Sequence, residues 1–238
     1  MVLTHGDDKG LVLPPRVAKI QVVIVPVGIT AKTSIEEKEK LNDEIREIET
    51  TLTRIGIRVK TDNRDGYSPG WKFNDWELKG VPLRIEFGPK DMAQRQVMTS
   101  RRDRDGKAPI AISALATDIP KLLETIQADM FNKADTEFRE HRKVITEWKD
   151  FVPALNDKNV CLIPHCLGGP CEDKIKDLSA RKPEGEGTMP VDDRAPSMGA
   201  KSLCIPWEQP GEIKEGTKCI NPECDQLAKK WVMYGRSY

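Results

Sequence analysis

Residues 20–27 read IQVVIVPV, and the arrangement of the first half of the chain follows from this stretch. It is almost continuously apolar and β-branched, which is typical of a strand covered on both faces near the centre of a parallel sheet. Ser34 and Glu37 follow as a capping box, which predicts the start of a helix. Apolar residues at spacings of four, three and four carry this helix to about Arg54 as one stripe: Leu41, Ile45, Ile48 and Leu52.

The segment after this helix completes a repeating pattern. Gly56 ends the helix, and residues 57–61 read as a second strand. A strand, a helix and a strand with short connections predict a right-handed βαβ unit with parallel pairing. Residues 81–87 and 94–102 read as further strands, and Asp105-Gly106 suits a hairpin turn. We therefore expect an α/β fold with a mixed sheet of five strands flanked by helices.

Two more helices are expected around this sheet. Residues 71–79 carry Trp71, Phe73 and Trp76, whose helical spacing favours packing in the core over stacking on a base. A long helix with a charged outer face is predicted over residues 117–147. Upstream, residues 1–18 read as extended, because their two consecutive prolines break any helix.

The character of the chain changes near residue 150. Short strands are predicted over residues 160–164, 202–206 and 230–234, with a short helix over 172–180. Residues 181–199 are rich in proline, glycine and charge without periodicity, and we expect a mobile loop there. These features indicate a second, smaller α+β domain.

The overall composition limits the classes of function. The 238 residues include 38 basic and 38 acidic side chains, and a net charge of zero argues against bulk electrostatic binding to nucleic acid. The chain contains no apolar run near the roughly 18 residues of a membrane span, and its first residues do not resemble a secretory signal. We therefore expect a soluble cytoplasmic protein with no membrane or DNA partner.

All six cysteines lie in the last third of the chain, and four form two C-x4-C pairs. Each pair encloses turn formers, which let two thiolates point at one ion. We predict a structural zinc site with four sulfur ligands: Cys166, Cys171, Cys219 and Cys224. Buried free cysteines, or a site that has lost its metal, are the alternatives.

Three neighbouring residues bear on this assignment. His165 could substitute as a ligand, although four cysteines already fill a tetrahedral shell. Cys161 and Cys204 sit inside apolar strands, and we expect both to be small core residues. A closed shell of thiolates has no open position, so the metal would support the fold and would not act as a Lewis acid.

Charge is segregated in the middle of the chain. Residues 54–107 contain thirteen basic and eight acidic side chains, which predicts a local positive face suited to phosphates. For any single lysine a solvated surface is the simpler interpretation. Arg84 differs because it interrupts an apolar strand: its guanidinium could pair with a base edge, while Glu77 could accept hydrogen bonds from base N–H groups.

Four strings resemble one family. Residues 67–91, YSPGWKFNDWELKGVPLRIEFGPKD, closely resemble the anticodon-binding domain of prolyl-tRNA synthetases of the eukaryotic and archaeal type. Residues 5–18, HGDDKGLVLPPRVA, resemble the last stretch of their class II catalytic domain. APSMGAKSLCIP at 195–206 and GRSY at 235–238 resemble their C-terminal zinc-binding domain.

This resemblance implies a domain organisation and a set of site residues. Residues 1–18 would be the tail of the catalytic domain, 19–150 an anticodon-binding domain of the class IIa fold, and 151–238 the zinc-binding domain. The family reads the guanines of the proline anticodon with residues that match Glu77, Arg84, Lys90 and, in the following hairpin, Lys107. Its zinc ligands match the four cysteines of the C-x4-C pairs, and its terminal carboxylate, here on Tyr238, folds back toward the catalytic domain.

The resemblance also predicts what this chain lacks. The parent enzyme joins proline to tRNA with ATP and Mg²⁺, and its ATP-binding motifs and proline pocket would precede His5. We therefore expect no ligase activity from these 238 residues alone. The family implies proline tRNA as partner, a homodimer formed through the catalytic domain, and membership of a multi-synthetase assembly. The alternatives are a stand-alone tRNA-binding or regulatory module and a structural zinc module that docks proteins.

Overall fold

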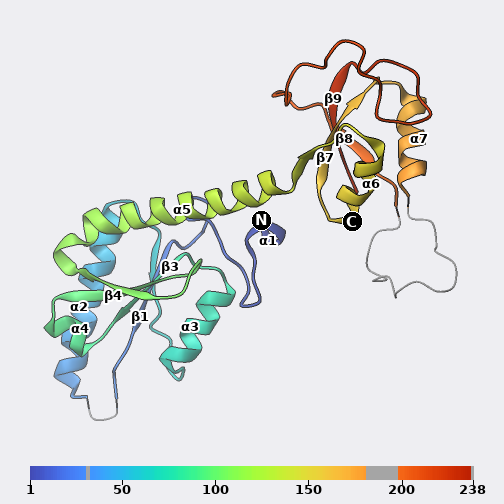
Figure 1. The fold of residues 1–238 in the computed structure, drawn as a ribbon. Coiled ribbons are helices and arrows are strands. Elements are labelled where there is room, and N and C mark those ends of the chain that lie inside the picture. The colour runs from blue at the N-terminus through green and yellow to red at the C-terminus, as the bar shows by residue number, and fades with distance from the viewer. Residues whose placement is uncertain (31–32, 181–197, 237–238) are drawn as a thin grey trace, which may run out of the picture. The chain divides into compact units, whose positions relative to one another are not determined.

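The chain forms two compact units. The computed structural model describes residues 1–30, 33–180 and 198–236. The units are Met1–Asp135 and Thr136–Tyr238, and each is described by itself (Figure 1). Most of the predicted loop at 181–199, and the predicted role of Tyr238, lie outside the described residues.

The first unit is built on a five-stranded mixed sheet. Its strand order is β2-β1-β3-β4-β5. β1 pairs in parallel with β2 and with β3, whereas β4 runs antiparallel to both of its neighbours. The predicted α/β fold with a mixed sheet is therefore confirmed. The strands are β1 Val22–Pro26, β2 Val59–Thr61, β3 Leu83–Phe87, β4 Gln96–Arg101 and β5 Lys107–Ala111.

Two helices cover one face of this sheet. α2 (Ile35–Arg54) begins with the predicted capping box, in which the amide of Glu37 donates to the Ser34 hydroxyl at 3.1 Å. Its predicted stripe is buried in one core with α5 (Leu115–Glu140) and the sheet. Burying each such side chain contributes about 1.5–3 kcal/mol, so packing, more than intrinsic propensity, holds α2 in place.

Helix α3 (Pro69–Leu78) packs on the opposite face, against β1. Trp76 is buried there with Val23 and Val25, and Phe73 packs against the same small cluster. The expectation that Trp71 is also a core residue is wrong, because its side chain is 44% exposed. The helix turns Lys72 and Trp76 inward, and Trp71 falls outside that stripe.

The first residues of the chain lie against the end of α3. The predicted extended conformation is wrong for Val2–His5, which form one helical turn, α1. Beyond it the amide of Leu11 donates to the Leu78 carbonyl, and that of Leu13 to the Gly80 carbonyl, both at 3.1 Å. Two short helical turns also escape the sequence pattern: α4 Pro89–Ala93 and η1 Ile112–Ala114.

The second unit contains a four-stranded sheet in the order β6-β7-β9-β8. Its strands are β6 Arg142–Val144, β7 Val160–His165, β8 Lys201–Cys204 and β9 Lys230–Gly235, and its helices are α6 Trp148–Asn156 and α7 Gly169–Ser179. The predicted helix over 117–147 is too long: α5 ends at Glu140, because the residues after it pair in parallel with β7.

The two remaining cysteines behave differently. Cys161 is fully buried in β7, as predicted. Cys204 is exposed, so its assignment to the core is wrong. It ends β8, the edge strand of the sheet, where the register against β9 is irregular. Among the described residues, no helix is long and apolar enough to cross a membrane.

Candidate RNA interface and metal centre

The register of the first sheet gathers polar side chains on one face. Arg84 of β3 lies opposite Ser100 of β4, which in turn lies opposite Lys107 of β5. Successive residues of a strand alternate between faces, so Arg84 and Glu86 share the face on which α3 packs, while Ile85 enters the core on the other.

These side chains form one network. The Arg84 guanidinium donates to the Glu77 carboxylate at 2.9 Å and to the Glu86 carboxylate at 3.1 Å. The Lys107 ammonium donates to Glu86 at 2.6 Å. The guanidinium also lies over the Phe73 ring, 4.1 Å from its centroid. We call Glu77, Arg84, Glu86 and Lys107 the charged cluster.

Exposure differs within the charged cluster. The Arg84 side chain is 10% exposed, against 31% for Glu77 and 47% for Lys107. Bonds to Glu77, Glu86 and Ser100 engage three of the five N–H donors of the guanidinium. The cluster therefore presents a carboxylate and an ammonium to solvent, with the guanidinium held between them.

The structure brings together three of the four residues predicted to read bases. Lys90 is exposed on α4, and in the described part of the chain no hydrogen bond or ion pair joins it to the other three. Sequence reasoning missed Glu86, which is 7% exposed and bonds both cations. Its spacing of two from Arg84 on a strand was a usable signal, because such residues share a face.

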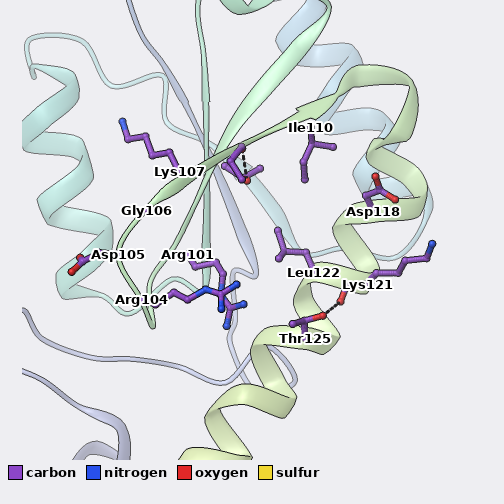
Figure 2. A pocket seen from close by; sticks show the side chains of 12 residues that line it. Arg101, Arg104, Asp105, Gly106, Lys107, Ile110, Asp118, Lys121, Leu122 and Thr125 are labelled. Atoms are coloured by element: carbon purple, nitrogen blue, oxygen red, sulfur yellow. Dashed lines mark hydrogen bonds between the residues drawn. The ribbon is translucent and has the colours of Figure 1, made fainter.

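The hairpin that carries Lys107 is anchored from behind. A cavity of about 500 Å³ lies between this hairpin and α5, and Leu122 and Thr125 of α5 line it. Figure 2 shows the Lys107 side chain pointing away from these two residues. At the turn end of the hairpin, Arg101 pairs with Asp103 and with Asp129 of α5, each at 2.6 Å. These pairs fix the strand that positions Lys107.

A buried carboxylate fixes helix α3, which supplies Glu77. The Asp62 side chain is 1% exposed and accepts hydrogen bonds from Arg64 at 2.7 and 2.9 Å and from the Trp76 indole at 2.7 Å. Burial by itself would raise the pKa of Asp62, but the bonds from Arg64 and Trp76 outweigh it and hold the pKa below its usual range.

We therefore expect the stability of the first unit to fall in acid. A depressed folded-state pKa contributes stability above the unfolded value of about 3.9, and that stability is lost as pH falls below it. Asp62→Asn should lower the free energy of unfolding at pH 7 and flatten its dependence on pH between about 4 and 2. Chemical unfolding at several pH values measures both effects. An unchanged slope in the variant would contradict this role for Asp62.

The second unit gathers its thiols as the C-x4-C spacing predicts. The Sγ atoms of Cys171 and Cys219 lie 3.6 Å apart, and those of Cys166 and Cys224 lie 3.8 Å apart. Zn–S bonds of about 2.3 Å in a tetrahedron separate sulfurs by about 3.8 Å, so these spacings suit such an ion. The Asn221 amide donates to Cys171 at 3.2 Å, as a supporting residue around a metal does.

His165 also borders this cluster. Its ligand atom and the Sγ atoms of Cys166, Cys171 and Cys219 all lie within 4.8 Å of one another. Its ring nitrogens already have partners, because Nδ1 accepts from the Leu167 amide at 3.1 Å and Nε2 lies 3.4 Å from the Tyr234 hydroxyl. Burial raises the pKa of the Cys171 and Cys219 thiols, so metal binding at this cluster has to displace protons.

Comparison with known proteins matches a protein family to each of the two units. Residues 21–122 match the family described as "Anticodon binding domain", and residues 148–238 match "Prolyl-tRNA synthetase, C-terminal". The fold and the first match define the class: the first unit holds an anticodon-binding domain of an aminoacyl-tRNA synthetase.

Relatives over the whole chain name the family. All 238 residues align at 50% identity with a putative proline–tRNA ligase of Saccharomyces cerevisiae, and the same length aligns at 42% with the cytoplasmic proline–tRNA ligase of Arabidopsis thaliana. A crystal structure of prolyl-tRNA synthetase from Cryptosporidium parvum, complexed with halofuginone and AMPPNP, covers the chain with a TM-score of 0.84 and 42% identity. The chain therefore carries an anticodon-binding domain and the C-terminal domain of prolyl-tRNA synthetases, and it is similar to proteins of that family over all of its residues.

The match is to one end of longer proteins. The chain spans 34% of the yeast relative, 41% of the Arabidopsis relative and 44% of the Cryptosporidium chain. A bifunctional glutamate/proline–tRNA ligase of Drosophila melanogaster aligns at 49% identity over 14% of its length.

Proposed function

We propose that the first unit reads the guanines of the proline anticodon with Glu77, Arg84, Lys90 and Lys107. The charged cluster is the observation that carries this proposal. A guanine edge offers acceptors at O6 and N7 and N–H donors on its Watson–Crick side. Glu77 can accept from those donors, while the adjacent Arg84 and Lys107 can donate to an acceptor.

The geometry of the charged cluster suits this pairing. Glu77 and Arg84 are already 2.9 Å apart, so a donor and an acceptor stand side by side before RNA arrives. Arg84 has little freedom, since Glu86 and Ser100 hold it from the sheet. Such preorganisation reduces the entropy lost on binding. Lys90, outside the network, would contact the RNA separately.

We propose that this segment serves ATP-dependent formation of prolyl-tRNA in translation, in preference to acting as a stand-alone tRNA-binding module. The identity of all 238 residues to part of proteins named as proline–tRNA ligases, 50% in yeast and 42% in Arabidopsis, supports this. Residues 1–18 would be the last part of a catalytic domain, and ATP and Mg²⁺ would bind in that domain. Residues 19–150 would form the anticodon-binding domain, and residues 151–238 the zinc-binding domain. The Arabidopsis relative supports a cytoplasmic location. A homodimer is a further expectation, and bifunctional relatives favour a multi-synthetase assembly.

We propose that Cys166, Cys171, Cys219 and Cys224 hold a structural Zn²⁺. The matching sulfur spacings support four thiolate ligands, and the hydrogen bonds of His165 favour a supporting place for its ring. The ion would link the turn before α7 to the turn before β9 and supply no chemistry to a substrate.

Binding of a 5′-fluorescein-labelled anticodon stem-loop of proline tRNA tests the anticodon proposal. We expect the chain to bind this RNA at least tenfold more tightly than a stem-loop in which adenines replace the anticodon guanines. Each contact between a side chain and a base edge that is lost costs about 1–3 kcal/mol of binding free energy. Fluorescence anisotropy at fixed salt gives both dissociation constants, and equal values would refute base reading.

A further inference from the structure

Two aromatic rings on the first unit stack on each other at the surface. The centroids of Tyr67 and Trp71 lie 4.0 Å apart, and their planes are inclined by 24°. Tyr67 is 49% exposed and Trp71 is 44% exposed. Large rings usually contribute to a core, so a stacked pair in contact with solvent marks a surface that can bind another molecule.

The guanidinium of an arginine lies over both of these rings and restricts their movement. The Arg64 guanidinium lies 5.0 Å from the centroid of Trp71 and 5.7 Å from that of Tyr67. It cannot swing away easily, because Asp62 holds it at two atoms and Asp75 holds it at 2.7 Å. The platform, meaning Tyr67 and Trp71 on Arg64, is therefore rigid before any ligand binds.

We propose that this platform stacks on one unpaired base of the bound tRNA, outside the guanines held by the charged cluster. The inference rests on the proposed function, since it assumes that the RNA loop lies along α3. Rings backed by a cation suit single-stranded nucleic acid, whose bases stack on aromatic faces while its phosphates meet positive charge. Two more cations, Lys60 and Lys79, lie over the neighbouring Trp76 ring.

The position of the platform separates its base from the guanine at Glu77. Trp71 and Glu77 belong to the same helix, six residues apart, which is about 9 Å along the axis and roughly a third of a turn around it. A base stacked on Trp71 is therefore a different one from the guanine at Glu77. The platform adds affinity without reading sequence, because every base has a flat face.

The test uses Trp71→Leu and Tyr67→Leu in the full chain, with the labelled stem-loop of proline tRNA. Each variant should weaken binding by about 5- to 150-fold for both the native loop and the guanine-to-adenine loop, so their ratio stays constant. Trp207→Leu is the matched control, because that tryptophan is fully exposed in the second unit. Circular dichroism and thermal unfolding verify that each variant keeps its fold.

A second measurement locates the base. An abasic site is placed at each loop position in turn, and the position stacked on the platform is the one whose removal costs the wild-type chain affinity but leaves Trp71→Leu unaffected. If folded Trp71→Leu and Tyr67→Leu bind like the wild type while the native loop is still preferred, the platform is wrong and anticodon reading stands. If the variants lose affinity but the two loops bind equally, the platform stands without base reading.

Discussion

Replacing Cys171 and Cys219 together with serine should abolish metal binding and destabilise the second unit by several kcal/mol. Structural zinc sites contribute binding free energies of about 10–16 kcal/mol that act as folding free energy. Here the thiols also lie in the hydrophobic core of that unit, beside Ile175 and Val232. We expect the melting transition of the second unit to fall on the order of 10–20 °C, while the first unit melts as before.

Elemental analysis for zinc and differential scanning calorimetry measure these two effects. The matched control is Cys204→Ser, which removes an exposed thiol from the same unit and should change neither zinc content nor melting. Lowering the pH should release zinc from the wild type, because the Cys171 and Cys219 thiols have raised pKa values and recapture their protons. Full metal content in the double variant would refute the assignment of these ligands.

Replacing Arg84 with alanine should remove most of the preference for the native anticodon. A guanidinium that contacts a base edge contributes about 1–3 kcal/mol, so the ratio of dissociation constants for the adenine-substituted and native stem-loops should fall by about 5- to 150-fold. Arg84→Lys should not restore it, because an ammonium lacks the planar pair of donors that Glu77 and Glu86 orient.

The ratio distinguishes base reading from a loss of positive charge. A phosphate contact would weaken binding to both loops equally and leave their ratio unchanged. Arg16→Ala supplies the control, because this arginine is 69% exposed and pairs only at the surface with Glu124. If Arg84→Ala remained folded and kept the full ratio, the charged cluster would have a structural role in place of a recognition role.

Local patterns predicted the first unit well. The β-branched run before Pro26 is typical of a buried strand, and the apolar stripe of α2 has the spacing of a helix. The short connections between these elements predicted the parallel pairing of the sheet. The strand at Arg142–Val144 was not predicted, because it forms by pairing with β7, eighteen residues further along the chain, and this pairing leaves no local pattern in the sequence. The helical pattern ahead of it continued without an obvious stop signal.

Local sequence patterns also predicted some of the site residues and missed others. Spacing alone identified the four cysteines, since tight turns converge their thiols. Arg84 and Glu77 were predicted from the strand pattern and from their hydrogen-bonding chemistry, whereas Lys90 and Lys107 came only from resemblance to a family. Glu86, which joins Arg84 to Lys107, came only from the structure. The exposure of Trp71 could not be predicted from helical spacing alone. The face of α3 that is buried depends on the hydrogen bond between the Trp76 indole and Asp62, which lies outside the helix.

The contact between the first residues and the end of α3 makes position 80 intolerant of any side chain. Gly80 has a positive φ of 73°, and a Cβ atom there would lie 2.7 Å from the backbone of Leu11. Alanine would push the amino-terminal segment outward and break the bond between Leu13 and residue 80. Asp7, which pairs with Arg102 at 2.7 Å, would lose its place as well. A single methyl group could thus detach the amino-terminal arm while every charged side chain remained.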